Sequence, residues 1–461
     1  MPVLRSFLVA AALLLAGSAC GEDAPAPQPP LSSPGTLSSP GAEGTYEVWL
    51  VDQSDSDHVA RMGGRLYVYR GADLEGDEPA AAEAIEVVDL AGATAELCVQ
   101  ETGVNPVRPH MLLFDPAGER GILSFVGSGH VVVMDAASRE PLDCFRTSPG
   151  AGGAQQAHAA FPSHDGTYIV VANQNGKLLE RLDVDPSTGT VTHAMDATLD
   201  LANGVTPSGA LREDPALRPD NAPICPVVDR DSRFVWVTLR GGGLLVVDPR
   251  ATPMAIVGEY DREAVKGNGC GGVQVGDAMF LNSGGAPVNL QGQPHPHLSL
   301  YGFDVYRFPV DGYQAGNPPN TPEPEILFTA DGARDSHGMA AVADGRFVWV
   351  MDRHADVAEV ISTETGEWVR TVPLAGPVSE VPAPDLVDVS PSGQHLFVAL
   401  RGPTPLTGDP HNATGTTPGL GIIRVTGDGS EGRLEAVARI SNVHEGVELA
   451  DAHALRVRRL P

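Results

Sequence analysis

The sequence predicts an all-β protein folded as a seven-bladed β-propeller, with four strands in each blade. Three features support this prediction: one pattern recurs along the chain, its strands are short and evenly spaced between turns rich in Gly, Pro and Asp, and no segment shows helical periodicity. The length of 461 residues would favour two or three domains, but a repeat of this kind indicates one continuous ring. Residues 45–461 are therefore expected to form a single domain.

The repeat begins at a polar residue that stands eight positions before a turn glycine. Its clearest copies are HMLLFDPAG, HAAFPSHDG, HGMAAVADG and DLVDVSPSG, which start at His110, His158, His337 and Asp385. Each copy continues into a β-branched strand, a second apolar strand and a more polar fourth segment. Looser copies surround Cys225 and Cys270. The predicted blades are 108–149, 153–199, 223–261, 268–331, 335–376 and 382–441.

The seventh blade is expected to combine the two ends of the chain. Residues 45–70 contain TYEVWLVDQ and RLYVYR, which match the second and third strands of the other blades. Their missing first strand is found at the C-terminal end, where Asp451 and His453 precede ALRVRRL. A blade shared in this way closes the ring and removes exposed edge strands.

The first 44 residues predict export to the bacterial cell envelope, either the periplasm or the cell surface. Arg5, the apolar run Phe7–Leu15 and small residues up to Ala19 form a signal peptide over 1–19, too short to span a bilayer. The small residues before Cys20 resemble a lipobox, which implies a lipid on Cys20 that anchors the protein to the membrane; ordinary cleavage near Ala19 is the alternative. Residues 20–44 then form a flexible linker rich in Pro and Ser.

Charge and cysteine content restrict the partners and the compartment. A formal net charge of −29 argues against binding of nucleic acid, which requires clustered Lys and Arg. We expect the protein to be a monomer. Four cysteines after Cys20 favour one or two disulfides in an oxidising compartment. Cys225 and Cys270 start inner strands of consecutive blades and are expected close together, as a disulfide or as channel-facing thiols. Cys98 and Cys144 are assigned to outer strands and are expected farther apart.

The recurring phrase of a polar anchor, four or five residues, and S/P-x-D-G-x-x-V/I-x-V resembles the YVTN-type seven-bladed propellers. That superfamily includes bacterial lactonases of the 6-phosphogluconolactonase type, selenium-binding proteins and the propeller of nitrous oxide reductase. The resemblance covers nearly the whole mature chain and implies the fold rather than an activity. In the reductase, histidines at the top of the channel hold a copper cluster, and the lactonase-like propellers use the same face. This chain has no cupredoxin domain and places Cys and Asp at some channel positions.

Propeller topology is expected to gather scattered polar residues at one face of the ring. The segments before the first strands would surround the channel mouth, and the loops after the second strands would lie outside them, bringing His130, Asn173, Asn175, Lys177, Arg240, Arg353 and His354 near the same face. Imidazole ligands suit copper, zinc, iron or nickel. We therefore predict a divalent transition metal site, copper or zinc, formed by His110, His158, His337, His453, Asp385 and Cys270.

Two classes of function remain open from the sequence. The first is an envelope enzyme with a metal at the channel mouth, either a lactonase-like hydrolase or a copper-type oxidoreductase. The second is a non-catalytic propeller that binds a small molecule or a protein at the same face, with histidines that only stabilise the blades. No catalytic residue can be assigned. Asp335, Asp388 and Asp451 are candidates for fixing the imidazole tautomers.

Overall fold

The structure, a computed structural model, describes residues 45–202, 221–267, 269–284, 302–407 and 413–460. The chain divides into two units, Met1–Ala42 and Glu43–Pro461. The predicted signal peptide, the lipid-anchor cysteine Cys20 and the linker lie outside the described residues. No helix in the described ranges is long and apolar enough to cross a membrane.

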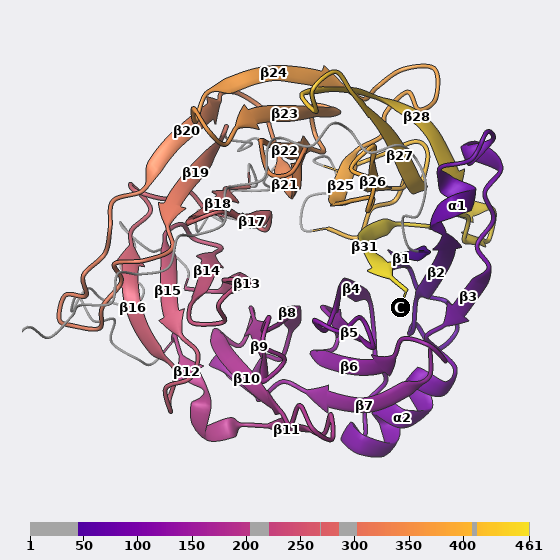
Figure 1. The fold of residues 1–461 in the computed structure, drawn as a ribbon. Helices are drawn as coiled ribbons and strands as arrows, with labels where there is room; N and C mark the ends of the chain where they lie inside the picture. Colours follow the sequence, from indigo (N-terminus) through magenta and orange to yellow (C-terminus); the bar gives the residue numbers. More distant parts are fainter. Residues whose placement is uncertain (1–44, 203–220, 268, 285–301, 408–412, 461) are drawn as a thin grey trace, which may run out of the picture. The chain divides into compact units, whose positions relative to one another are not determined.

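The second unit is an all-β ring of seven four-stranded antiparallel blades around a central channel, as predicted (Figure 1). Blade 1 contains β4 (Pro109–Phe114), β5 (Arg120–Phe125), β6 (His130–Asp135) and β7 (Pro141–Arg146). Blade 2 contains β8 (Ala157–Pro162), β9 (Tyr168–Asn173), β10 (Leu178–Val184) and β11 (Val191–His193), with β12 (Leu199–Asp200) added to β10. Blade 3 contains β13 (Pro223–Val228), β14 (Val235–Leu239), β15 (Leu244–Asp248) and β16 (Ala255–Tyr260).

The remaining consecutive blades follow the same order from the channel outward. Blade 4 contains β17 (Gly272–Val275), β18 (Ala278–Asn282), β19 (Phe303–Pro309) and β20 (Glu325–Ala330). Blade 5 contains β21 (Ser336–Val342), β22 (Phe347–Asp352), β23 (Val357–Ser362) and β24 (Trp368–Pro373). Blade 6 contains β25 (Pro384–Val389), β26 (His395–Leu400), β27 (Gly419–Thr426) and β28 (Glu431–Arg439), followed by a small hairpin of β29 (Val443–His444) and β30 (Val447–Glu448).

Blade 7 joins the two ends of the chain, which confirms the predicted closure. Its strand order is β31 (Ala452–Arg459), β1 (Tyr46–Asp52), β2 (Arg65–Arg70) and β3 (Glu86–Asp89). The ladder between β1 and β31 is antiparallel, and the Leu460 N–H donates to the Thr45 carbonyl at 2.9 Å. The N- and C-terminal segments therefore seal the ring by backbone hydrogen bonds.

Apolar strand faces packed against the neighbouring blades hold the ring together. Trp49, Trp236 and Trp349 are fully buried, and the apolar residues of the strands form clusters that extend from one blade to the next. At the turns, Gly118 and Gly345 have φ values of +68° and +83°, which an L residue adopts only with strain. The turn into the second strand therefore explains why glycine stands eight positions after the polar residue that begins the repeat.

The helical segments are the part of the fold that the sequence did not predict. They are α1 (Gly71–Leu74), α2 (Ala93–Thr102) and the 3₁₀ turns η1 (Pro79–Ala81), η2 (Ala151–Gly153) and η3 (Met195–Ala197). The assignment of Cys98 to an outer strand was wrong, because it lies on α2 and forms a disulfide with Cys144 of β7, with a Cα–Cα distance of 5.2 Å. Only Thr94, Ala95 and Cys98 of α2 are buried, too few for a helical stripe to be recognised.

Candidate functional site

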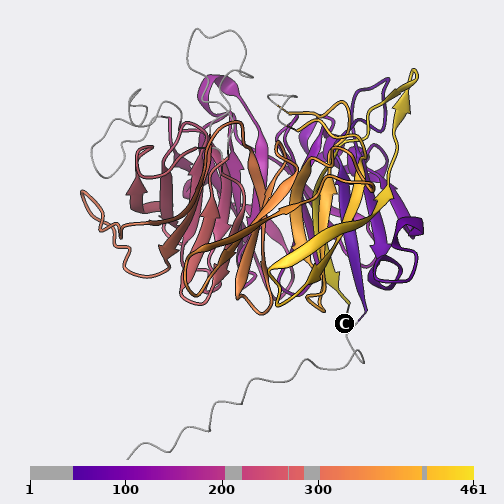
Figure 2. The ribbon, with the colours of Figure 1, turned by 90° about the horizontal axis from the view of Figure 1, so that it is seen from above.

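The candidate site lies on the face of the ring where the first strand of each blade starts, which we call the mouth face. The strands cross the thickness of the ring, so β31 starts at this face and ends at the opposite one, where Figure 2 marks the C-terminus. In five blades the second residue of the first strand is His or Asp, and the ladder skips it in a β-bulge. A bulge redirects its side chain away from the regular pleat. The redirected residues are His110, His158, His337, Asp385 and His453.

The bulges bring these five side chains, all singled out in the sequence, into one cluster that we call the mouth cluster. The ring centroids of His158 and His110 are 4.6 Å apart, and His110 stacks on His453 at 3.7 Å. The ring of His453 lies 5.3 Å from that of His337. The Oδ1 atom of Asp385 is 3.3 Å from Nε2 of His337 and 4.0 Å from Nε2 of His453.

The hydrogen bonds of Gln53 determine the tautomer of His110. Its amide Nε2 donates to Asp451 at 2.9 Å, and its Oε1 accepts from Arg108 Nε at 3.0 Å. Because Oε1 can only accept, Nδ1 of His110, 3.3 Å away, must carry the proton. The lone pair of His110 is therefore on Nε2, which is buried and has no hydrogen-bond partner among the described residues.

Backbone carbonyls fix two further imidazoles in the same way. Nδ1 of His453 donates to the His110 carbonyl at 2.9 Å, which leaves the lone pair on Nε2, the nitrogen that faces Asp385. His158 bonds to the Ile224 carbonyl, and its Nδ1 is buried without a partner in the described part of the chain. Nε2 of His337 and Oδ1 of Asp385 also lack a well-directed hydrogen bond. Buried polar atoms are normally paired, so four unpaired ones on side chains that contact one another indicate a ligand site.

Burial keeps the four imidazoles neutral. It lowers the pKa of His158 and of His337 to about 3. It also holds the pKa values of His110 and His453 well below their ordinary range. Neutral imidazole is the form that coordinates a metal, so no proton has to leave these rings at neutral pH.

Two arginines keep Asp385 ionised. Burial alone would raise its pKa, but the charges of Arg353 and Arg401 hold the pKa well below its usual value. Arg401 Nη1 and Arg353 Nη1 approach Oδ2 of Asp385 at 2.6 and 3.2 Å, which leaves Oδ1 facing the histidines. Arg401 is fully buried and is also paired with Asp451 at 2.6 Å, while Arg353 pairs with Asp335 at 2.7 Å.

The proposed tautomer-fixing role of the aspartates was wrong. Asp335 and Asp451 pair with arginines, and Asp388 accepts from the Val457 N–H toward the far end of β31. The residues that sequence reasoning missed share one position, directly after the second strand of a blade. Gln53 and Arg401 stand there, as do the arginines of blades 3 and 5, Arg240 and Arg353.

Cys270 cannot act as a thiolate ligand in the oxidised protein, so its prediction as a ligand is wrong for that state. It forms a disulfide with Cys225, with a Cα–Cα distance of 5.2 Å, which confirms that the two residues are neighbours. Among the residues expected in the loops after the second strands, Arg353 contacts the mouth cluster through its ion pair with Asp385. His130 is instead held by Ser128 and Thr102, both at 2.8 Å.

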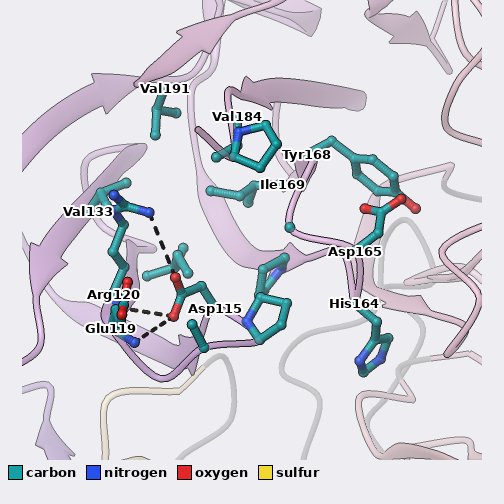
Figure 3. Close-up of a pocket in the computed structure, with 16 residues that line it drawn as sticks. Asp115, Glu119, Arg120, Val133, His164, Asp165, Tyr168, Ile169, Val184 and Val191 are labelled. Atoms are coloured by element: carbon teal, nitrogen blue, oxygen red, sulfur yellow. Dashed lines mark hydrogen bonds and ion pairs between the residues drawn. The ribbon is translucent and has the colours of Figure 1, made fainter. Parts of the chain in front are cut away.

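A cavity of about 230 Å³ on the opposite face, between blades 1 and 2, offers a contrasting environment (Figure 3). Ile122, Val133 and Ile169 form part of its apolar wall. Oδ1 of Asp115 accepts the backbone N–H groups of Glu119 and Arg120, and Arg120 Nη1 lies 3.8 Å from Asp115 Oδ2. None of the described residues lining this cavity has a buried side-chain polar atom without a partner. The mouth cluster, in contrast, contains four such atoms among the described residues.

Three members of the mouth cluster are placed to hold a metal ion. One nitrogen each of His337 and His453 and one oxygen of Asp385 all lie within 4.8 Å of one another. Two imidazoles and a carboxylate are a recurrent ligand set for Zn²⁺ and for non-haem iron, and they leave coordination positions open; imidazole also suits copper. The residues present therefore fit a transition metal ion.

Comparisons with known proteins identify the fold. No protein-family model matches the chain, and no curated protein sequence matches it. The periplasmic gluconolactonase PpgL of Pseudomonas aeruginosa has a TM-score of 0.53 and 16% identity, with 90% of this chain and 100% of that chain covered. The chain shares the seven-bladed propeller fold of this gluconolactonase.

Other solved structures show the same architecture. A putative 6-phosphogluconolactonase from Bacteroides fragilis has a TM-score of 0.52 and 14% identity, covering 89% of this chain and 98% of its own. A hypothetical selenium-binding protein from Sulfolobus tokodaii has a TM-score of 0.58 and 10% identity, covering 90% and 94%. At these identities the likeness establishes the fold alone, so the function has to be argued from the site.

Proposed function

We propose that this protein is an exported, membrane-anchored hydrolase that opens lactones at a metal ion bound by the mouth cluster. The observation that carries the proposal is the pair of neutral, buried imidazoles, His337 and His453, whose Nε2 atoms face the free oxygen of an ionised Asp385. The names of the structural neighbours supply the substrate class, because several are described as lactonases.

The ligands would be His337, His453 and Asp385, and the ring of His110 stacks on that of His453. A bound divalent ion supplies a water of lowered pKa and polarises the carbonyl oxygen of the substrate. The protein contributes a fixed, dehydrated ligand set. Arg353 and Arg401 hold Asp385 in its ionised form, and the carbonyl of His110 fixes the tautomer of His453.

Arg108 provides a positive charge for the anion that forms when water attacks a lactone carbonyl. Its side chain contacts the neutral acceptors Gln53 Oε1 and the Leu406 carbonyl, and it has no carboxylate within ion-pair distance among the described residues. Burial, together with Arg401, lowers its pKa to about 10, so it remains charged at neutral pH. A fixed charge of this kind stabilises the negative charge that develops in acyl transfer.

The experiment is lactone hydrolysis by the full chain, with glucono-lactone as the probe and acid release as the signal. Zn²⁺-loaded wild type should hydrolyse the lactone, whereas His453→Ala and Asp385→Asn should lower the rate and the metal content together. His164→Ala is the matched control, because His164 lines the cavity on the opposite face and should leave both unchanged. Loss of activity in this control alone would move the site to that cavity.

The remaining outcomes separate the alternatives. Metal without hydrolysis would contradict the hydrolase and favour a copper-type oxidoreductase, which the same ligand set suits. Failure to bind any metal would favour a propeller that only binds a small molecule or a protein at the mouth face.

A further inference from the structure

A second group of metal-ligating residues lies beside the mouth cluster, in blades 2 to 4. The Sγ atoms of Cys225 and Cys270 and one ring nitrogen of His158 all lie within 4.8 Å of one another. The cysteines are buried, with exposed fractions of 0% and 4%, and they form a disulfide that links blade 3 to the start of blade 4. In the oxidised protein the two sulfurs are bonded to each other.

The free nitrogen of His158 distinguishes this group from a merely structural disulfide. A hydrogen bond to the Ile224 carbonyl occupies one ring nitrogen, and Nδ1 is buried without a partner in the described part of the chain. Such an atom costs free energy unless a ligand satisfies it. Within the mouth cluster, the ring of His158 contacts that of His110, which in turn stacks on His453. His158 does not belong to the group of His337, His453 and Asp385, so its lone pair is not needed there.

The other disulfide provides an internal comparison. Cys98, Cys144 and His130 also place their ligand atoms within 4.8 Å of one another. At His130, however, Thr102 Oγ1 lies 2.8 Å from Nε2 and Ser128 Oγ lies 2.8 Å from Nδ1. Both ring nitrogens of His130 are therefore occupied by hydrogen bonds. Unlike His158, His130 has no free ring nitrogen to offer a metal ion.

We propose that reduction of the Cys225–Cys270 disulfide creates a second metal site, formed by two thiolates and the imidazole of His158, for a thiophilic ion such as Zn²⁺ or Cu⁺. Thiolates and imidazole are the ligands that these ions prefer. The mouth face would then hold two different sites, one present in both redox states and one present only under reducing conditions. The second site does not depend on the hydrolase activity.

The reduction step balances with a dithiol as the reductant. The S–S bond breaks, two electrons and two protons pass from the dithiol to the two cysteine sulfurs, and the dithiol becomes a disulfide. In the test, a phosphine donates the two electrons and becomes a phosphine oxide, and water supplies its oxygen and the two protons. The two thiol protons leave when the thiolates bind the ion. Nδ1 of His158 needs no deprotonation, because it already carries a lone pair.

The test compares metal stoichiometry in oxidised protein and in protein reduced with a phosphine, after mass labelling has confirmed free Cys225 and Cys270. Reduced wild type should bind one more Zn²⁺ than oxidised wild type, and Co²⁺ in its place should show thiolate-to-metal charge-transfer absorption. His158→Ala leaves the disulfide intact for folding. In the reduced protein it should lower the affinity for the additional ion by at least about tenfold. Cys225→Ser with Cys270→Ser should abolish it.

Matched variants identify which site has responded. Cys98→Ser with Cys144→Ser should keep the additional ion, and Asp385→Asn should remove the first ion without removing the second. The proposal is overturned if reduced protein binds no additional ion, if the ion is lost in the Cys98/Cys144 variant, or if the bridge resists reduction until the chain unfolds. Failure of the first site alone would contradict the proposed hydrolase and leave this result unaffected.

Discussion

Mild acid should destabilise the metal-free protein, because its buried histidines stay neutral while those of the unfolded chain bind protons. The four imidazoles of the mouth cluster have lowered pKa values, as does His130, whose pKa burial lowers to about 4. A histidine in the unfolded chain titrates near pH 6.5. The stability is therefore complete above that value and falls as the pH drops through it.

The size of the effect follows from these pKa values. Between about pH 7 and about pH 5.5, each neutral buried histidine costs roughly 1.3 kcal/mol of unfolding free energy, or roughly 6 kcal/mol for five. Asp52 and Asp356 act in the opposite direction, because burial raises the pKa of each to about 6 and the native state gains their protons. Together they offset at most roughly 1.5 kcal/mol, because solvent screens the half-buried Asp356, and the net loss of unfolding free energy is about 5 kcal/mol.

Urea unfolding of chelator-treated protein, followed by tryptophan fluorescence at the two pH values, measures this loss. His337→Gln removes one titrating group and should reduce the pH-dependent loss by about 1.3 kcal/mol relative to wild type. Equal stability at both pH values, or no change in the variant, would show that the histidines are hydrated or charged in the native protein. Either result would refute the electrostatic argument for a neutral metal-binding cluster.

Three further predictions follow from the contacts. Arg401→Met leaves Asp385 and Asp451 buried with fewer cations and should lower the unfolding free energy by about 3 to 5 kcal/mol in urea titrations; a change within error would show that the pairs are solvated. Gln53→Leu removes the acceptor that keeps the proton of His110 on Nδ1. If Nε2 of His110 is a metal ligand, this change should weaken metal binding about 10- to 100-fold, and an unchanged affinity would argue against His110 as a ligand. Cys20→Ala should abolish labelling by a lipid precursor, and identical fractionation of variant and parent would contradict the anchor.

The sequence predicted the blades and the mouth cluster for the same physical reason. The turn into the second strand requires a positive φ, which places Gly118 and Gly345 a constant eight positions after their anchors. Equivalent positions of different blades then lie at the same face of the ring and at the same distance from the central channel. This is why His110 and His337 could be assigned to one cluster although 227 residues separate them.

The supporting residues were not predictable to the same degree, because they follow no constant residue type. The position after the second strand holds Gln53 in blade 7 and Arg401 in blade 6, and only contacts across the channel show that both support the cluster. The disulfide between Cys98 and Cys144 depended on recognising α2, whose buried residues are few. In both cases the deciding interactions join segments that no local pattern connects.

Metal stoichiometry of the oxidised full chain tests the central claim most directly. After chelation, reconstitution with Zn²⁺ and removal of excess ion, wild type should retain one ion per chain at the site of His337, Asp385 and His453. Each single replacement, His337→Ala, Asp385→Asn or His453→Ala, should reduce that ion to a substoichiometric amount while the propeller stays folded by circular dichroism. Wild-type protein that retains no ion, or variants that retain as much as wild type, would contradict the account.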